Sequence, residues 1–168
     1  MGKNLEILIN PDSRLRKKST ALEAKNIEAG KYTQLGLDMC KTMLSSDGIG
    51  LAAPQISQNI RLITINTKDG ALIMFNPKIV KKSLFKNWDE EGCLSVPYYF
   101  GEVRRYQSIT CQFIDEKGKP KKMRASGLMA RVMQHEIDHL DGILFIDKAK
   151  NLKKIDEGDI EEMGERKK

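Results

Sequence analysis

The sequence has no long apolar run, no internal repeat and no low-complexity linker. None of its apolar stretches approaches the roughly 18 residues that a membrane-spanning helix needs. The N-terminus carries a basic residue, but no continuous apolar segment and no small-residue cleavage site follow it, so we expect no secretory signal. A length of 168 residues suits one domain. We therefore expect a single domain over residues 1–168, with its core at about residues 5–148.

Cysteine and aromatic residues are also scarce. The three cysteines, Cys40, Cys93 and Cys111, are odd in number and widely spaced, which argues against a disulfide framework. The number and spacing of the cysteines favour a reducing compartment, by default the cytoplasm. Aromatic residues make up 6% of the chain and do not alternate with basic residues, as they do in nucleic-acid stacking platforms. We interpret the net charge of +6 as a solvated surface, and we expect no specific nucleic acid and no membrane among the partners.

The hydrophobic pattern predicts an α+β fold, in which short and mostly antiparallel strands pack around a central helix. Apolar residues at helical spacing predict an N-terminal helix from about residue 28 to residue 45. The central helix begins after Ser126, which we expect to cap it, and ends before Gly142. The charged stretch 149–168 predicts a C-terminal helix or tail. Strands are predicted at 61–66, 71–75, 78–82, 109–113 and 121–125.

The central helix carries the motif His-Glu-x-x-His at residues 135–139. Because residues i and i+4 share one face of a helix, His135 and His139 can reach the same metal ion. Glu136 lies about 100° around the helix from His135, where its carboxylate can accept a proton from water whose pKa the metal lowers to about 7. The alternative is two surface histidines on an amphipathic helix. Since the chain has only two histidines and both lie in the motif, we favour the metal site.

Two histidines leave such a metal without the third protein ligand that a catalytic site usually has. Downstream, Asp141, Asp147 and Glu161 form no recognisable ligand pattern. Upstream, Cys93 lies between a glycine and a short apolar stretch ending at Pro97, which predicts a tight loop. A lone cysteine is more often a small buried hydrophobic residue, but the missing ligand favours Cys93 as the third one.

A glycine-rich segment at Gly48–Gln55 is a further candidate. Its two glycines allow the backbone to approach a ligand closely, and the side-chain amide of Gln55 could donate to a developing oxyanion. The segment lacks the Gly-Lys-Ser/Thr ending of a phosphate-binding loop. Taken alone, it is also consistent with a helix C-cap followed by a turn.

Taken together, three segments resemble peptide deformylase. That family carries G-x-G-L-A-A-P-Q, E-G-C-L-S and Q-H-E-x-D-H-L in this order, and here they are Gly48–Gln55, Glu91–Ser95 and Gln134–Leu140. The resemblance spans about residues 5–148, and the short spacing between the first two motifs is similar to the compact bacterial-type form. It implies an enzyme that removes the formyl group from the N-terminal formyl-methionine of newly synthesised polypeptides and releases formate.

The resemblance implies that Cys93, His135 and His139 hold one divalent metal ion, with water in the fourth position. Glu136 would take a proton from this water and return it to the leaving amine. The family implies Fe²⁺ in the cell. A ligand set of two histidines and one cysteine also suits Zn²⁺, Ni²⁺ or Co²⁺, any of which could occupy the site in purified protein.

Further residues follow from the same resemblance. Gln55 and the backbone N–H of Leu94 would hold the oxyanion together with the metal. We also expect Glu91 and Arg105 to pair and to brace the cysteine loop. The segment 98–101 is more aromatic than is usual in the family, which would reshape the rim of the substrate pocket. Substrate contacts are implied at Ile49, Gly50, Gly92, Leu128 and Val132.

Two other functions stay open from the sequence. A general zinc endopeptidase with His-Glu-x-x-His would cleave internal peptide bonds and would not depend on Cys93. A non-catalytic metal- or ribosome-binding module would bind metal without turnover, but it would need neither Glu136 nor Gln55. The partners that the resemblance implies are nascent chains that begin with formyl-methionine and, transiently, the ribosome.

Overall fold

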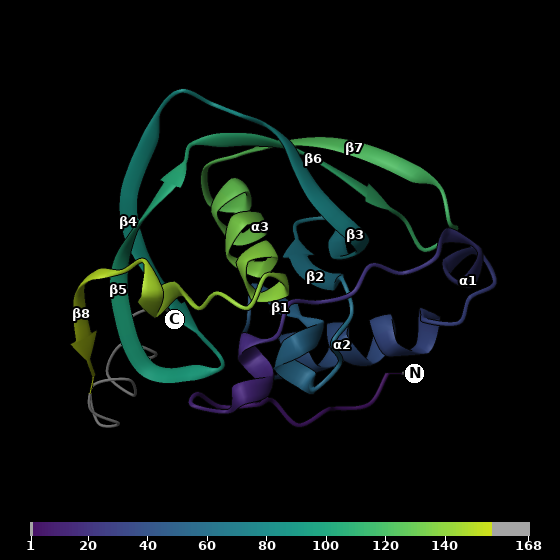
Figure 1. Cartoon of the computed structure of the whole chain (residues 1–168), viewed down its shortest axis with the longest axis horizontal. Coiled ribbons are helices and arrows are strands. Elements are labelled where there is room, and N and C mark those ends of the chain that lie inside the picture. Colours follow the sequence, from purple (N-terminus) through teal and green to yellow (C-terminus); the bar gives the residue numbers. More distant parts are fainter. Residues whose placement is uncertain (1, 156–168) are drawn as a thin grey trace.

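The computed structural model describes residues 2–155, which form two antiparallel sheets with one helix between them (Figure 1). The larger sheet has the strand order β1-β2-β3-β6-β7, and the smaller has the order β4-β5-β8. This arrangement confirms the predicted α+β fold of mostly antiparallel strands around a central helix. The α-helices are α1 (Ala24–Glu28), α2 (Thr33–Ser45) and α3 (Gly127–Leu140). The strands are β1 (Gly50–Ala52), β2 (Leu62–Thr67), β3 (Gly70–Lys82), β4 (Lys86–Cys93), β5 (Val96–Tyr106), β6 (Ser108–Ile114), β7 (Pro120–Ser126) and β8 (Lys150–Lys154).

Helix α3 is buried on nearly all sides because it lies between the two sheets (Figure 1). Its apolar side chains pack in one core with residues of β2, β3, β6 and β7. Its other buried side chains are polar: Arg131, Gln134, His135, Glu136 and His139. Burying a polar group costs free energy unless the group is hydrogen-bonded or paired, so this density of polar groups in one helix indicates a functional site.

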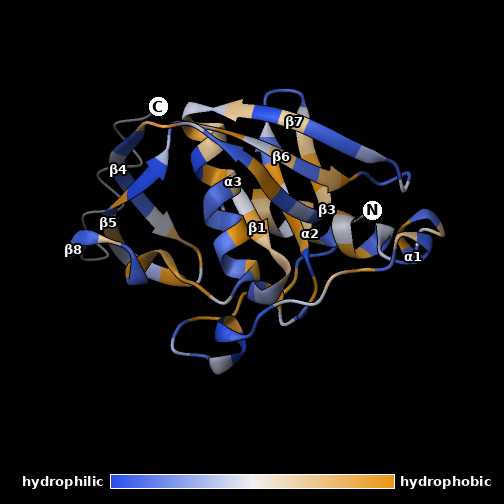
Figure 2. Ribbon diagram, turned by 45° about the horizontal axis from the view of Figure 1, so that its top comes forward, coloured by the Kyte–Doolittle hydropathy of each residue, from blue (hydrophilic) through white to orange (hydrophobic). Residues whose placement is uncertain are grey.

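The two remaining cores position the segments that face α3. Met39 and Met43 of α2 pack against apolar residues of β1, β2 and β3. Val96 and Val103 of β5 pack with the N-terminal segment and with Phe145. Along β6 the buried residues alternate with more exposed ones, as the sequence predicts for a half-buried strand, and Figure 2 shows the same alternation of apolar and polar residues.

Two predicted boundaries are wrong, and local backbone geometry explains both. The N-terminal helix was expected from about residue 28, but α1 ends at Glu28 and α2 begins only at Thr33. Between them Gly30 has φ +74°, a left-handed conformation that stops the first helix. The predicted strands 71–75 and 78–82 are one strand, β3, whose register shifts between Phe75 and Lys78.

The smaller sheet was not predicted. All the residues of β4 from 86 to 90 are exposed and mostly polar, so they show no period of two. Cys93 is the last residue of β4 and pairs with Val96, so the predicted tight loop is the two-residue turn that follows it. The predicted C-terminal helix or tail is wrong for Lys150–Lys154, which form β8 and are held by backbone pairing with β5. The rest of that prediction falls on residues 156–168, which lie outside the described part, so the single-domain expectation over 1–168 stays a prediction.

The ends of α3 follow one prediction and contradict another. Ser126 occupies the N-cap position, but its side chain makes no capping hydrogen bond. The backbone N–H of Gly127 donates to the carbonyl of Gln107. Gly142 follows the last turn with φ +73° and donates its N–H to the carbonyl of His139, as a C-terminal glycine is expected to do. Within residues 2–155, no helix combines the length and the apolar character needed to cross a membrane.

Gly142→Ala tests how tightly the end of α3 is held. An added Cβ would overlap the backbone carbonyl of Arg16, in addition to the cost of a left-handed conformation. We expect the free energy of unfolding to fall by about 3 kcal/mol in a denaturant titration. Gly127→Ala is the matched control, because Gly127 has φ +57° but nothing lies within 4 Å of its Cβ position. The free energy of unfolding of Gly127→Ala should fall by about 1 kcal/mol. Equal losses would contradict the proposed overlap.

Candidate active site

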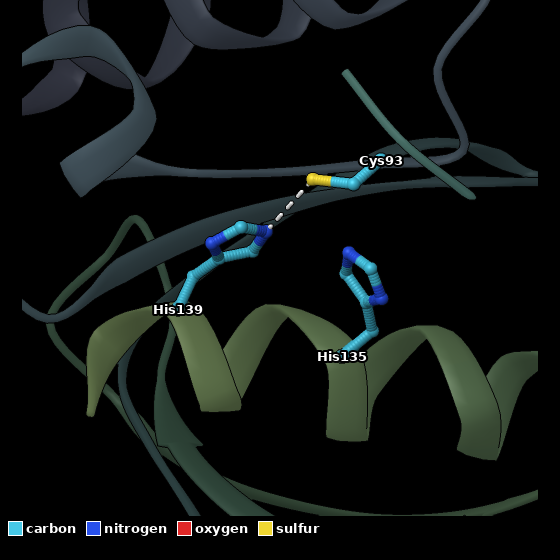
Figure 3. Close-up of side chains that lie close together, drawn as sticks. All are labelled: Cys93, His135 and His139. Atoms are coloured by element: carbon cyan, nitrogen blue, oxygen red, sulfur yellow. Dashed lines mark hydrogen bonds between the residues drawn. The ribbon is translucent and has the colours of Figure 1, made fainter. Parts of the chain in front are cut away.

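Three potential metal ligands converge beside α3. His135 and His139 lie one turn apart on the helix, and Cys93 comes from the end of β4. Figure 3 shows the three side chains pointing toward one another. Their ligand atoms all lie within 4.8 Å of one another, and Cys93 Sγ is 3.2 Å from His139 Nε2. The structure thus brings together the three residues that the sequence singled out.

The second ring nitrogen of His135 is held by Glu91. Nδ1 lies 3.0 Å from Glu91 Oε2. Burial raises the pKa of the Glu91 carboxyl, but hydrogen bonds from His135 and Arg105 outweigh this effect and hold the pKa below its ordinary value. An ionised carboxylate can only accept, so Nδ1 must carry the proton. Nε2 is therefore the nitrogen left for a metal. Burial lowers the pKa of the His135 ring, but hydrogen bonds with Cys93 and Glu91 outweigh this effect and raise the pKa to about 10, so a metal ion would displace the proton on Nε2.

His139 is even more deeply buried, at 1% exposure. Burial lowers the pKa of its ring well below the ordinary value. The ring is consequently neutral, which is the form that binds a metal ion. Its Nδ1 is buried and has no hydrogen-bond partner within residues 2–155.

Glu91 is the centre of a buried ionic cluster that links β4, β5 and α3. Arg105 donates to both of its oxygens, each at 2.9 Å, so the expected pair with Glu91 is present. Arg131 donates to Oε1 at 2.7 Å. Arg105 also donates to Asp138, which in turn binds Lys148. The sequence analysis missed Arg131 and Asp138, although Arg131 lies four residues before His135 and so shares its face of the helix.

Glu136 is buried and points away from this cluster, toward Gly50. Its Oε2 has no hydrogen-bond partner among the described residues. Burial raises the pKa of its carboxyl to about 7. A carboxyl with this pKa can either give or take a proton near neutral pH.

The side-chain amide of Gln55 is fixed next to Cys93. Its Oε1 accepts a hydrogen bond from the backbone N–H of Ala52 at 2.8 Å, which orients the amide. Its Nε2 then faces Ser95 Oγ at 3.0 Å and Cys93 Sγ at 3.6 Å. The sequence analysis missed Ser95, a buried residue in the second motif.

A cavity of about 540 Å³ opens onto this site. Glu136 and His135 line it from α3, and Tyr98 and Phe100 line it from the aromatic segment. Two of its apolar walls, Ile49 and Leu128, are still 48% and 62% exposed, so the cavity offers free apolar surface. It includes every residue expected to contact substrate: Ile49, Gly50, Gly92, Leu128 and Val132. Gln55 and Leu94 also line it.

Comparison with known proteins places this geometry in a family. The family model described as Polypeptide deformylase matches residues 4–155. A peptide deformylase of Rhizobium meliloti is 43% identical over 153 residues, which cover 88% of this chain and 86% of that protein. A class I type b peptide deformylase from Acinetobacter baumannii with bound Met-Ala-Ser aligns with a TM-score of 0.83 and 32% identity, over 88% of this chain and 99% of that one. A peptide deformylase from Synechococcus elongatus in complex with actinonin aligns with a TM-score of 0.80 and 38% identity, over 88% and 79%. The chain therefore belongs to the polypeptide deformylase family.

Proposed function

We propose that this protein is a metal-dependent hydrolase that removes the formyl group from the N-terminal formyl-methionine of new polypeptides and releases formate. The observation that carries the proposal is the convergence of Cys93, His135 and His139 beside a cavity that Glu136 also lines. The Acinetobacter relative binds Met-Ala-Ser, a peptide that begins with methionine. A peptide of this kind is what deformylation leaves behind.

The residues present suit a divalent metal ion. Two imidazole nitrogens and one cysteine sulfur form a three-ligand set, which leaves a position open, as catalytic sites require. The buried and unpartnered Oε2 of Glu136 is a further sign that a polar group belongs in this space. When bound, the metal would act as a Lewis acid that lowers the pKa of water and polarises the formyl carbonyl.

Glu136 is the proposed proton carrier. Its raised pKa, about 7, suits a group that first removes a proton from the attacking water and then returns it to the amine that leaves. Because its carboxylate is buried against Gly50, few orientations are open to it. The proton therefore has a defined acceptor, the carboxylate of Glu136, which lines the cavity.

Gln55 and Leu94 are the proposed oxyanion donors. The amide of Gln55 is oriented by Ala52, which holds its Nε2 beside Cys93 in a residue that lines the cavity. It can donate from there to the carbonyl oxygen that becomes negative. The exposed apolar side chains of Ile49 and Leu128 would receive the methionine side chain. Backbone groups at Gly50 and Gly92 would align the peptide as an added strand.

The proposal also covers the metal ion, the location of the protein in the cell and its partners. We favour Fe²⁺ in the cell, with Zn²⁺, Ni²⁺ or Co²⁺ as substitutes in purified protein, and metal analysis of anaerobically prepared protein tests this preference. An enzyme that acts on nascent chains would work in the cytoplasm and would meet the ribosome transiently. Membership of the deformylase family supports neither of the two alternatives, the general endopeptidase and the non-catalytic module.

Glu136→Gln tests the proton carrier in an assay of formate release from formyl-Met-Ala-Ser. We expect kcat/KM to fall at least about 100-fold, because the amide cannot take up a proton, while one metal ion per chain is retained.

Cys93→Ser should lower both metal content and activity, because a hydroxyl is a poorer ligand than a thiolate. Full activity in Cys93→Ser would contradict the ligand assignment, and full activity in Glu136→Gln would contradict the proton carrier.

Gly50→Ala tests whether the position of Glu136 matters. The added Cβ would overlap the carboxylate of Glu136 and would lie 2.7 Å from its Cδ, so the carboxylate must move. We expect about a tenfold or greater loss of kcat, since small misplacements of a catalytic group are costly. Gly36→Ala in α2 is the matched control, because its Cβ would lie 2.8 Å from Ile73 Cδ1, away from the cavity. It should lower the melting temperature and leave kcat unchanged. Unchanged kcat in Gly50→Ala would refute this role.

A further inference from the structure

Arg131 is a buried cation for which the proposed reaction supplies no role. Only 6% of the residue is exposed, although it carries a full charge. Its Nη1 donates to Glu91 Oε1 at 2.7 Å and to the carbonyl of Val103 at 2.9 Å. Its Nη2 donates to the carbonyl of Asn87 at 3.2 Å. Its guanidinium donors thus go to Glu91 and to strands of the smaller sheet, and the residue also lines the cavity.

The position of Arg131 on α3 links it to a metal ligand. It lies four residues before His135, on the same face of the helix, and both side chains contact the carboxylate of Glu91. Arg131 and Arg105 Nε bind Oε1, whereas Arg105 Nη2 and His135 Nδ1 bind Oε2. Each oxygen thus has two donors. A carboxylate whose two oxygens each accept two hydrogen bonds cannot rotate without breaking a charged hydrogen bond.

The guanidinium of Arg105 is held by two side chains, those of Glu91 and Asp138. Its Nη1 is drawn to Asp138, which also binds Lys148, a residue with a half-exposed side chain. Glu91 and Arg105 could therefore shift together while keeping their two-point contact. Arg131 is anchored independently, by the backbone carbonyls of β4 and β5.

We propose that Arg131 is a positioning residue: by holding Glu91 Oε1, it fixes Oε2 against His135 and so directs His135 Nε2 at the metal. This inference rests on the proposed metal centre. Partners that orient a metal-binding histidine commonly change metal affinity about 10- to 100-fold when they are removed. Arg131 would thus set how tightly the metal is held without being one of its ligands.

Metal affinity separates this role from a merely structural one. Metal-free wild type, Arg131→Met and Arg131→Lys are titrated with Co²⁺ against a competing chelator, and the visible absorption of bound Co²⁺ is recorded. Arg61→Met is the matched control, because Arg61 binds Asp141 at 2.8 Å at the far end of α3 and lies outside the Glu91 cluster. We expect the Kd for Co²⁺ to rise about 10- to 100-fold in Arg131→Met, with a shifted spectrum. Arg61→Met should lose stability but keep the wild-type Kd and spectrum.

Arg131→Lys keeps a cation next to Glu91 but gives up the donors to the two strands. It should recover part of the affinity while remaining less stable than wild type, and its Kd provides the test if Arg131→Met does not fold. An unchanged Kd in Arg131→Met, an equal loss in Arg61→Met, or a loss in Arg131→Lys as large as that in Arg131→Met would overturn the proposal. If wild type itself does not bind one Co²⁺ per chain, the proposed metal centre fails, and this inference fails with it.

Discussion

A single buried carboxylate connects the parts of this molecule that make its site. Glu91 lies on β4, yet its hydrogen bonds reach β5 through Arg105 and α3 through Arg131 and His135. An ionised carboxylate is costly to bury, and removing one partner from such a group is strongly destabilising. Here two guanidinium groups and an imidazole N–H compensate the cost. The position of α3 relative to the smaller sheet is thereby defined by charge as well as by packing.

This connection has a direct consequence for the three potential metal ligands. Two of them belong to the helix and the third belongs to the strand that carries Glu91, so their mutual distances depend on how β4 lies against α3. Cys93 is two residues from Glu91 in sequence. The carboxylate that orients the ring of His135 therefore also fixes the strand that presents the sulfur. Glu136, one residue further along α3, turns toward the cavity and stays free of the cluster.

The sequence predicts the helices and the larger sheet better than the smaller sheet, for physical reasons. Segments with one buried face show a clear period, as Ile109, Cys111 and Phe113 do in β6. Strands β4 and β8 have mostly exposed side chains, so their backbone pairing leaves little trace in the order of residue types. The break at Gly30 and the shift in β3 depend on local backbone conformations that hydrophobic periodicity does not report.

In the site, too, the residues that follow a local pattern were predictable and those that depend on distant partners were not. His135, Glu136 and His139 follow from helical spacing alone, because i and i+4 share a face. Cys93 and Gln55 were candidates from their local sequence, but only the motifs of a family linked them to the helix, since the fold brings them there. Arg131, Asp138 and Ser95 were missed, because their roles arise from partners distant in sequence: Arg131 is 40 residues from Glu91, and Ser95 is 40 residues from Gln55.

The central claim is that one cysteine and two histidines hold a metal next to Glu136. X-ray absorption at the metal edge of the loaded protein tests it most directly. The account predicts one sulfur at about 2.3 Å and two imidazole nitrogens at about 2.0–2.1 Å, with a fourth, lighter donor. A coordination shell without sulfur, or with a single imidazole, would contradict it.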